Sequence, residues 1–169
     1  VAVRLLEWNS RQVTPRGEIL EVLGWPDDAG IDIRGIILRH GLREEFPDEV
    51  LREAESVSVT AWDEVLLERV DWRDATVITI DPSDARDFDD AIWVRRRGAG
   101  WELAVHIADV SHYVRPDTGL DREARKRGNS TYLVDRVLPM LPEQLSNGIC
   151  SLVPGEDRLT RCAVMQFEP

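Results

Sequence analysis

The sequence predicts a mixed α/β fold of the α+β type, and three features of its pattern support this. Residues 76–80, 91–95 and 101–107 are rich in β-branched and aromatic residues, which predicts three central strands. Residues 120–127 follow a Thr-Gly pair and end at Gly128, which predicts a helix. Residues 161–167 predict a final strand, and prolines force residues 138–142 to be extended. At 169 residues the chain is long enough for one proper core.

The region before residue 71 has a different pattern. Residues 1–8 and 17–23 predict two strands, which we interpret as the last hairpin of a small β-barrel because two strands alone are unstable. Isoleucines at helical spacing predict a helix that stops at Gly41, and Pro47 begins a second helix. Residues 61–70 predict a third amphipathic turn. The chain begins without Met, so we interpret it as a piece of a longer protein.

Charge and composition limit the possible functions. The net charge of −11 argues against a simple nucleic-acid-binding surface, which usually carries a basic excess. No apolar stretch approaches the roughly 18 residues that a membrane helix needs, so we expect no membrane association. The only cysteines, Cys150 and Cys162, lack metal-ligand spacing. We expect both to be inert, buried thiols in a reducing cytoplasm.

An acidic run between two predicted strands is the main functional signal. Residues 80–91 contain aspartates at positions 81, 84, 87, 89 and 90. Carboxylates held in mutual repulsion cost stability unless a cation binds among them. The run contains no Cys or His, so Mg²⁺ or Mn²⁺ would be the natural ion. Two such ions would suit displacement at phosphorus.

Simpler interpretations of these residues remain open. An acidic run can be a solvated loop with local turns, and Asp84 is most simply a turn former. A calcium-binding EF-hand is a poor alternative, because the run lacks the central Gly and the terminal Glu. His106 and His112 lie on or near a predicted strand, where packing is a better explanation than catalysis.

Residues 79–91 resemble the signature of the ribonuclease II/ribonuclease R (RNB) family of exoribonucleases. The resemblance continues in the same order through residues 105–114, 120–125, 127–133 and 138–152. Residues 1–25 are similar to the end of the cold-shock domain, an OB-type barrel, that precedes the catalytic domain in that family. The resemblance implies a cold-shock hairpin over residues 1–26, a helical linker over 27–70 and the truncated start of an RNB catalytic domain over 71–169.

The resemblance also implies a function and a set of site residues. It implies processive 3′→5′ hydrolysis of single-stranded RNA to nucleoside 5′-monophosphates. The cofactor would be Mg²⁺, which Mn²⁺ could replace. The whole protein would be a monomer in the cytoplasm. Asp81, Asp87, Asp89 and Asp90 correspond to the family aspartates around the metals, and loss of Asp89 is expected to be the most damaging. Tyr132 corresponds to the aromatic residue that stacks near the 3′ end of the RNA.

Part of the family's active site is not represented in these residues. The later part of the family's catalytic domain supplies an arginine, a glutamate and a second aromatic residue, so we expect the isolated chain to be a poor enzyme. Two alternatives stay open. The parent could be a non-catalytic RNA-binding relative, or the chain could be an acidic metal-binding or interaction domain unrelated to RNA.

Overall fold

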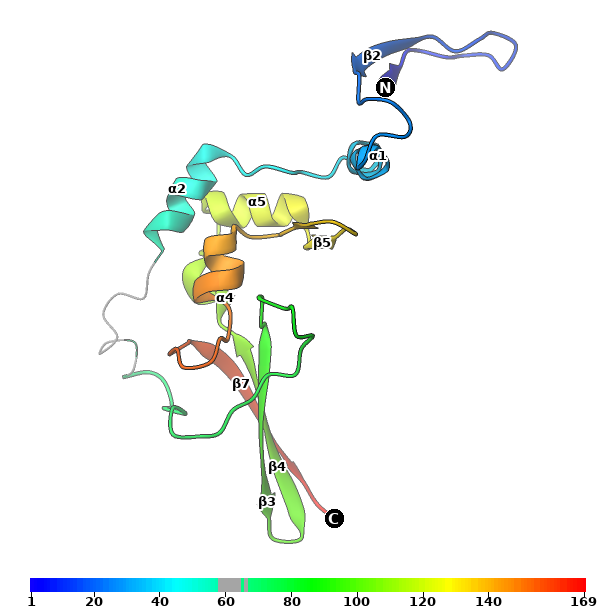
Figure 1. The fold of residues 1–169 in the computed structure, drawn as a ribbon. Coiled ribbons are helices and arrows are strands. Elements are labelled where there is room, and N and C mark those ends of the chain that lie inside the picture. The colour runs from blue at the N-terminus through cyan, green and yellow to red at the C-terminus, as the bar shows by residue number, and fades with distance from the viewer. Residues whose placement is uncertain (58–64, 66) are drawn as a thin grey trace. The chain divides into compact units, whose positions relative to one another are not determined.

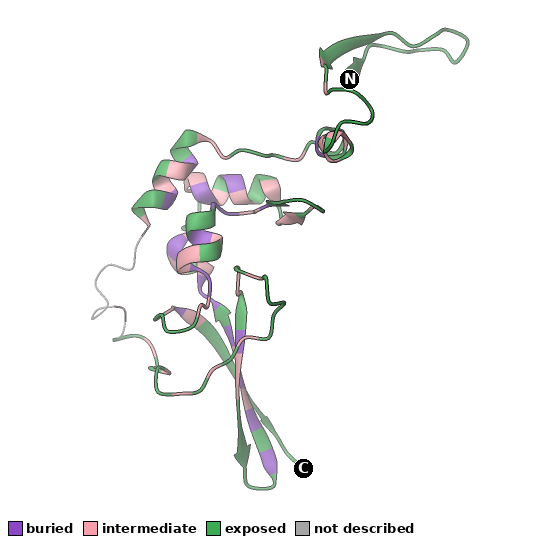
Figure 2. Cartoon of the chain, in the orientation of Figure 1, coloured by how far each residue is buried: buried purple, intermediate pink, exposed green. Residues whose placement is uncertain are grey.

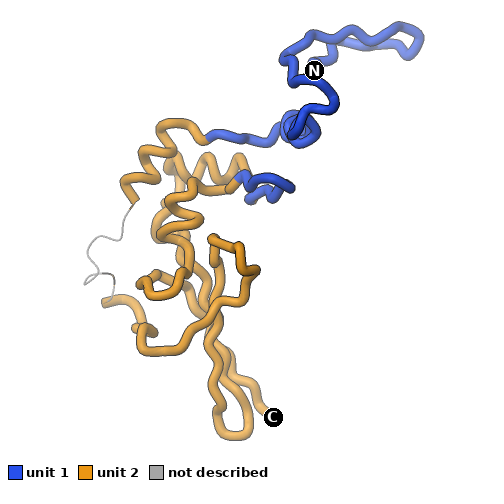
Figure 3. Tube along the Cα trace, viewed as in Figure 1, with its two compact units in different colours: residues 1–45, 130–138 blue, residues 46–129, 139–169 orange. Residues whose placement is uncertain are grey.

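The computed structural model describes residues 1–57, 65 and 67–169. The chain divides into two compact units, shown in Figure 3. The first comprises residues 1–45 and 130–138, and the second comprises residues 46–129 and 139–169. Helices and strands occur in both units (Figure 1), which confirms the mixed α/β class. None of the described helices is long and apolar enough to cross a membrane.

The first unit contains a hairpin, a helix and a short ribbon. Strands β1 (Ala2–Leu5) and β2 (Gly17–Glu21) pair antiparallel, as the sequence predicts. Helix α1 (Ile31–His40) follows, and Gly41 ends it in the left-handed conformation that glycine adopts at low cost. Strands β5 (Thr131–Tyr132) and β6 (Val137–Leu138) form a separate antiparallel ribbon that the sequence does not predict.

The second unit is built on a three-stranded antiparallel sheet. Its strands are β3 (Asp90–Arg97), β4 (Gly100–Ala108) and β7 (Thr160–Phe167), in the order β3-β4-β7. Residues along β4 alternate between buried and more exposed positions (Figure 2), because successive side chains point to opposite faces. On the buried face the Trp72 ring packs edge-on against Trp93 and His106. The opposite face carries the exposed Trp101 and Ile107.

The helices of this unit form its apolar core. Those that lie fully within the described residues are α2 (Asp48–Ser56), α4 (Val110–Tyr113), α5 (Gly119–Arg127) and η1 (Gln144–Ile149). Helix α5 begins with an N-cap bond from the Asp121 amide to Thr118 Oγ1 and ends at Gly128, as predicted. The core consists of buried residues from these helices and the segments that follow them: Val50, Ala54, Tyr113, Leu120, Leu141, Leu145, Cys150 and Leu159.

Two sequence predictions in this unit are wrong. Residues 76–80 do not form a strand, because their only pairing is a single bridge between Ile78 and Ile92. Ile80 is 78% exposed and Pro82 has no amide hydrogen, so the pairing cannot continue toward the acidic run. Cys162 is exposed, because it lies on the edge strand β7, whereas Cys150 is buried and both thiols are free. The predicted turn at residues 61–70 lies mostly outside the described residues.

Candidate metal centre

The acidic run forms a loop between the Ile78–Ile92 bridge and strand β3. Ile78 and Ile92 exchange two backbone hydrogen bonds of 2.9 and 2.8 Å, which fix the entry to the loop. Asp90 is the first residue of β3, where it pairs with Ile107 of β4. The Ala85 amide donates to the Pro82 carbonyl at 3.0 Å, so Asp84 lies within a turn, as predicted. The loop is therefore anchored at both ends.

Two other parts of the unit make hydrogen bonds to the backbone of the second half of the loop. The Phe88 amide donates to Ser151 Oγ at 3.0 Å, and the Phe88 carbonyl accepts from the Leu152 amide at 2.9 Å. The Asp89 carbonyl accepts from the Ala108 amide, also at 2.9 Å. Sequence reasoning missed Ser151, because nothing near residue 151 signals a contact with a loop that lies so far away in the chain.

Four of the predicted site residues form one electrostatic group. The pKa of the Asp89 carboxyl is raised, first by desolvation and then by the negative charges of Asp87, Asp90 and Asp81. The structure therefore brings the carboxylates of Asp81, Asp87 and Asp90 within electrostatic reach of Asp89. Asp89 is the residue on which the other three act.

The donor chemistry of this group fits a hard divalent cation. Every candidate donor is a carboxylate oxygen, the type of ligand that Mg²⁺ and Mn²⁺ prefer. Over residues 1–57, 65 and 67–169, no three His, Cys, Asp or Glu side chains converge closely enough to hold an ion as they stand. The loop thus provides the right donors on a fixed backbone. The assignment of Asp81, Asp87, Asp89 and Asp90 as metal ligands stays a prediction.

Tyr132 belongs to the other compact unit. It lies in strand β5, and its side chain is 66% exposed. Exposed aromatic rings are the side chains on which bases stack in proteins that bind single-stranded nucleic acid. Its predicted contact with the 3′ end of an RNA stays a prediction.

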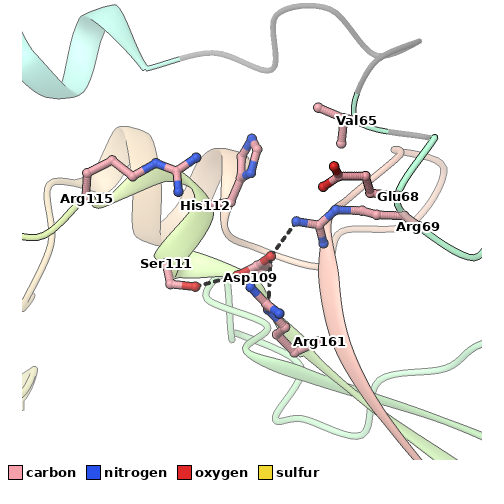
Figure 4. A pocket seen from close by; sticks show the side chains of 8 residues that line it. All are labelled: Val65, Glu68, Arg69, Asp109, Ser111, His112, Arg115 and Arg161. Carbon is pink, nitrogen blue, oxygen red and sulfur yellow. Dashed lines mark hydrogen bonds and ion pairs between the residues drawn. The ribbon is translucent and has the colours of Figure 1, made fainter.

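Asp109, which follows β4, differs from Asp89 because its carboxylate is surrounded by hydrogen-bond donors and positive charges (Figure 4). Its fully buried carboxylate accepts hydrogen bonds from Arg69 Nη2 at 2.6 Å and from Ser111 Oγ at 2.7 Å. Arg161 Nε lies 3.3 Å away. Burial alone would raise the pKa of Asp109, but the hydrogen bonds from Ser111, Arg69 and Arg161 lower it to about 2. This carboxylate is therefore fully neutralised by partners within the protein.

A pocket of about 360 Å³ opens beside this ion-pair cluster. It is lined by Val65, Glu68, Arg69, Asp109, Ser111, His112, Arg115 and Arg161. Arg69 also donates to the Thr160 carbonyl at 3.2 Å, so it joins the ends of β4 and β7. Because Arg69 and Arg161 are already paired with Asp109, we interpret the cluster as structural. The buried His106, whose ring bonds to Thr160 Oγ1 at 3.2 Å, also has the packing role that was predicted.

Comparisons with known proteins identify the family. Residues 69–169 match the RNB domain, and residues 1–47 match the cold shock domain. The chain belongs to the RNB family. Ribonuclease R of Thermotoga maritima is 48% identical over 171 residues, which cover 99% of this chain and 24% of that protein. Ribonuclease R of Escherichia coli is 46% identical, and the matched part covers 20% of it. The chain thus spans a fifth to a quarter of these relatives.

Solved structures agree with this assignment. Mycoplasma genitalium RNase R in complex with double-stranded RNA superposes with a TM-score of 0.87 at 35% identity, over 98% of this chain and 30% of that one. Yeast Ssd1, described as a pseudonuclease, reaches a TM-score of 0.75 at 21% identity, over 97% of this chain and 21% of that one, and shows a shared fold only.

Proposed function

We propose that this chain carries the metal-binding loop of a Mg²⁺-dependent exoribonuclease, which degrades single-stranded RNA processively from the 3′ end and releases nucleoside 5′-monophosphates. The observation that carries the proposal is the group of four carboxylates centred on Asp89, on a loop with a fixed backbone. Membership of the RNB family and the relatives named ribonuclease R support it. The whole protein would act as a monomer in the cytoplasm, with domain boundaries near residues 26 and 70.

In this proposal Asp81, Asp87, Asp89 and Asp90 hold the metal. Bound divalent ions would supply an activated water and stabilise the leaving oxygen during displacement at phosphorus. The contribution of the chain itself is to hold the loop backbone, so that only the aspartate side chains have to move to converge on an ion. The backbone is held because the Asp89 carbonyl accepts a hydrogen bond from the Ala108 amide and because Asp90 pairs with Ile107 in the sheet.

Tyr132 would hold the end of the substrate. Stacking of an aromatic ring on a base contributes about 1–3 kcal/mol per base and tolerates any sequence, as a degradative enzyme requires. The exposed ring of Tyr132 fits this role. Because in-line displacement needs the RNA to be held along its length, we expect the 169 residues alone to hydrolyse RNA poorly.

The proposal is tested by titration calorimetry of Mn²⁺ and Mg²⁺ into the chain, with and without a short single-stranded RNA. We expect binding that RNA strengthens, and a loss of at least about tenfold in affinity for Asp89→Asn. Asp84→Asn is the matched control, because Asp84 lies in the turn and outside the group of four. Tyr132→Ala should reduce the effect of RNA while leaving the affinity for Mn²⁺ alone unchanged.

The outcomes separate the proposal from its alternatives. Absence of metal binding in both conditions, or equal losses for the Asp84 and Asp89 variants, would contradict the metal site. Metal binding that RNA does not change would favour an acidic metal-binding domain unrelated to RNA. Metal and RNA binding without hydrolysis by the whole protein would identify a non-catalytic relative, as the fold shared with a pseudonuclease allows.

A further inference from the structure

Ser151 contacts the acidic loop from a distant part of the chain. Its hydroxyl accepts a hydrogen bond from the Phe88 amide at 3.0 Å across a separation of 63 residues. The same hydroxyl donates to the Arg86 carbonyl at 2.7 Å. A serine hydroxyl has one donor hydrogen and two acceptor positions, so these two bonds together fix its orientation. Ser151 therefore makes two directed contacts with the loop backbone.

Ser151 is itself rigidly held. It is fully buried, and its amide donates to the Gly148 carbonyl at 3.0 Å. Its own carbonyl accepts from Arg158 Nε at 2.8 Å. The residue lies just after η1, in which the backbone of Gly148 is non-helical. A buried hydroxyl on a backbone held from both sides can serve as a fixed anchor.

The anchored backbone lies between two of the proposed metal ligands. Phe88 separates Asp87 from Asp89, and its amide and carbonyl are bound by Ser151 and Leu152, which are adjacent in sequence. The two aspartate side chains thus extend from a peptide segment whose position is set by residues 151 and 152. Mutual repulsion drives the carboxylates apart, so a loop without this anchor would spread more easily.

We propose that Ser151 is a positioning residue of the metal centre, which holds the loop backbone so that the side chains of Asp87 and Asp89 can turn toward one divalent cation. This inference rests on the proposed function, because it concerns the same site. Ser151 does not bind the metal but acts through the loop. Residues that support ligands in this way typically change metal affinity by about 10–100-fold when they are removed.

The test compares four variants of the 169-residue chain. Ser151→Ala removes the anchor, and Ser151→Thr restores a hydroxyl with the same donor and acceptor capacity. Ser146→Ala is the matched control on η1, because within the described residues the Ser146 hydroxyl contacts only the Asn147 side chain, at 3.5 Å. Val50→Ala destabilises the core in α2 without touching the loop. The measurements are Mn²⁺ affinity by calorimetry and hydrogen exchange of the Phe88 amide by NMR.

We expect Ser151→Ala to weaken Mn²⁺ binding about tenfold and to speed exchange of the Phe88 amide. Ser151→Thr should recover most of both, whereas Ser146→Ala and Val50→Ala should bind Mn²⁺ as the wild type does. Unchanged affinity in Ser151→Ala would overturn the proposal. An equal loss in Val50→Ala would also overturn it, because the effect would then be general destabilisation.

Failure of the metal site and failure of the anchor give different results. A wild-type chain that binds no Mn²⁺ overturns the proposed metal site, while Phe88 exchange still decides whether Ser151 holds the loop. If Ser151→Ala does not fold, Ser151→Cys takes its place, because a thiol of similar size forms only weak hydrogen bonds. The cysteine variant should show the same pattern with a smaller loss.

Discussion

Asp89 and Asp109 lie close together in the second unit but have opposite surroundings. The Asp89 carbonyl accepts from the amide of Ala108, the residue immediately before Asp109. Asp89 is surrounded by other carboxylates, and its pKa is raised. Asp109 is surrounded by two arginines and a serine hydroxyl, and its pKa falls to about 2. Asp109 has counter-charges within the protein and should therefore stabilise the fold, whereas the negative charges around Asp89 should destabilise it.

The largest effect on the free energy of unfolding should come from removing the buried carboxylate of Asp109. Breaking a buried ion pair costs about 3–5 kcal/mol, and Asp109→Ala should lie near the lower end because Arg161 is largely exposed and can turn to solvent. The free energy of unfolding from urea denaturation measures this. Ser111→Ala, which removes one hydrogen bond to Asp109, should cost less. A cost below about 1 kcal/mol for Asp109→Ala would contradict the structural role of the cluster.

Asp89 should behave in the opposite way. Without added metal, Asp89→Asn should be at least as stable as the wild type, because the substitution removes a charge that three neighbours repel. Mn²⁺ at a hundredfold excess over its dissociation constant should stabilise the wild type by about 2.7 kcal/mol and leave Asp89→Asn unchanged. Urea denaturation with and without Mn²⁺ measures both quantities. A destabilised metal-free Asp89→Asn would mean that Asp89, like Asp109, is structural.

The sequence reveals the group of aspartates around Asp89 better than it reveals the buried ion pairs of Asp109. The four loop aspartates were found because they are close in sequence, and strands β3 and β4 and helix α5 because their patterns are local. Both arginine partners of Asp109, Arg69 and Arg161, lie far from it in the chain, so its neutralisation is not visible in the sequence. Ser151 escaped notice for the same reason, and residues 76–80 were misassigned because pairing, not composition, decides whether a segment is a strand.

A smaller, pH-dependent effect follows from the lowered pKa of Asp109. Its folded pKa of about 2 lies below the ordinary value of 3.8, so the folded state binds this proton less readily than the unfolded chain does. The stabilisation is complete above about pH 4 and is lost as the pH falls toward 2. The difference in unfolding free energy between the wild type and Asp109→Asn should therefore be smaller at pH 3 than at pH 6. Equal differences at the two pH values would show that folding does not shift the pKa of Asp109.

The smallest effect on stability is expected for Asp71, which is paired with an arginine but is not buried. Asp71 also has a pKa of about 2, chiefly because Arg73 hydrogen-bonds to it, with Nη2 at 2.6 Å. This pair is exposed to solvent, with both side chains more than half accessible. Exposed ion pairs contribute little to stability, so Asp71→Asn should leave the urea midpoint unchanged. An unfolding midpoint that falls as far as that of Asp109→Ala would contradict this reasoning.

Salt should distinguish the same two carboxylates in the unmodified chain. At 1 M salt the Debye length is about 3 Å, so the attraction between Asp71 and Arg73 is screened by ions that reach it freely. The buried carboxylate of Asp109 is out of their reach. NMR titration of the carboxyl carbons should therefore show the pKa of Asp71 rising toward 3.8 with salt while that of Asp109 stays near 2. If both pKa values rise together, solvent reaches Asp109, and the contrast between Asp109 and Asp89 would have to rest on the raised pKa of Asp89 alone.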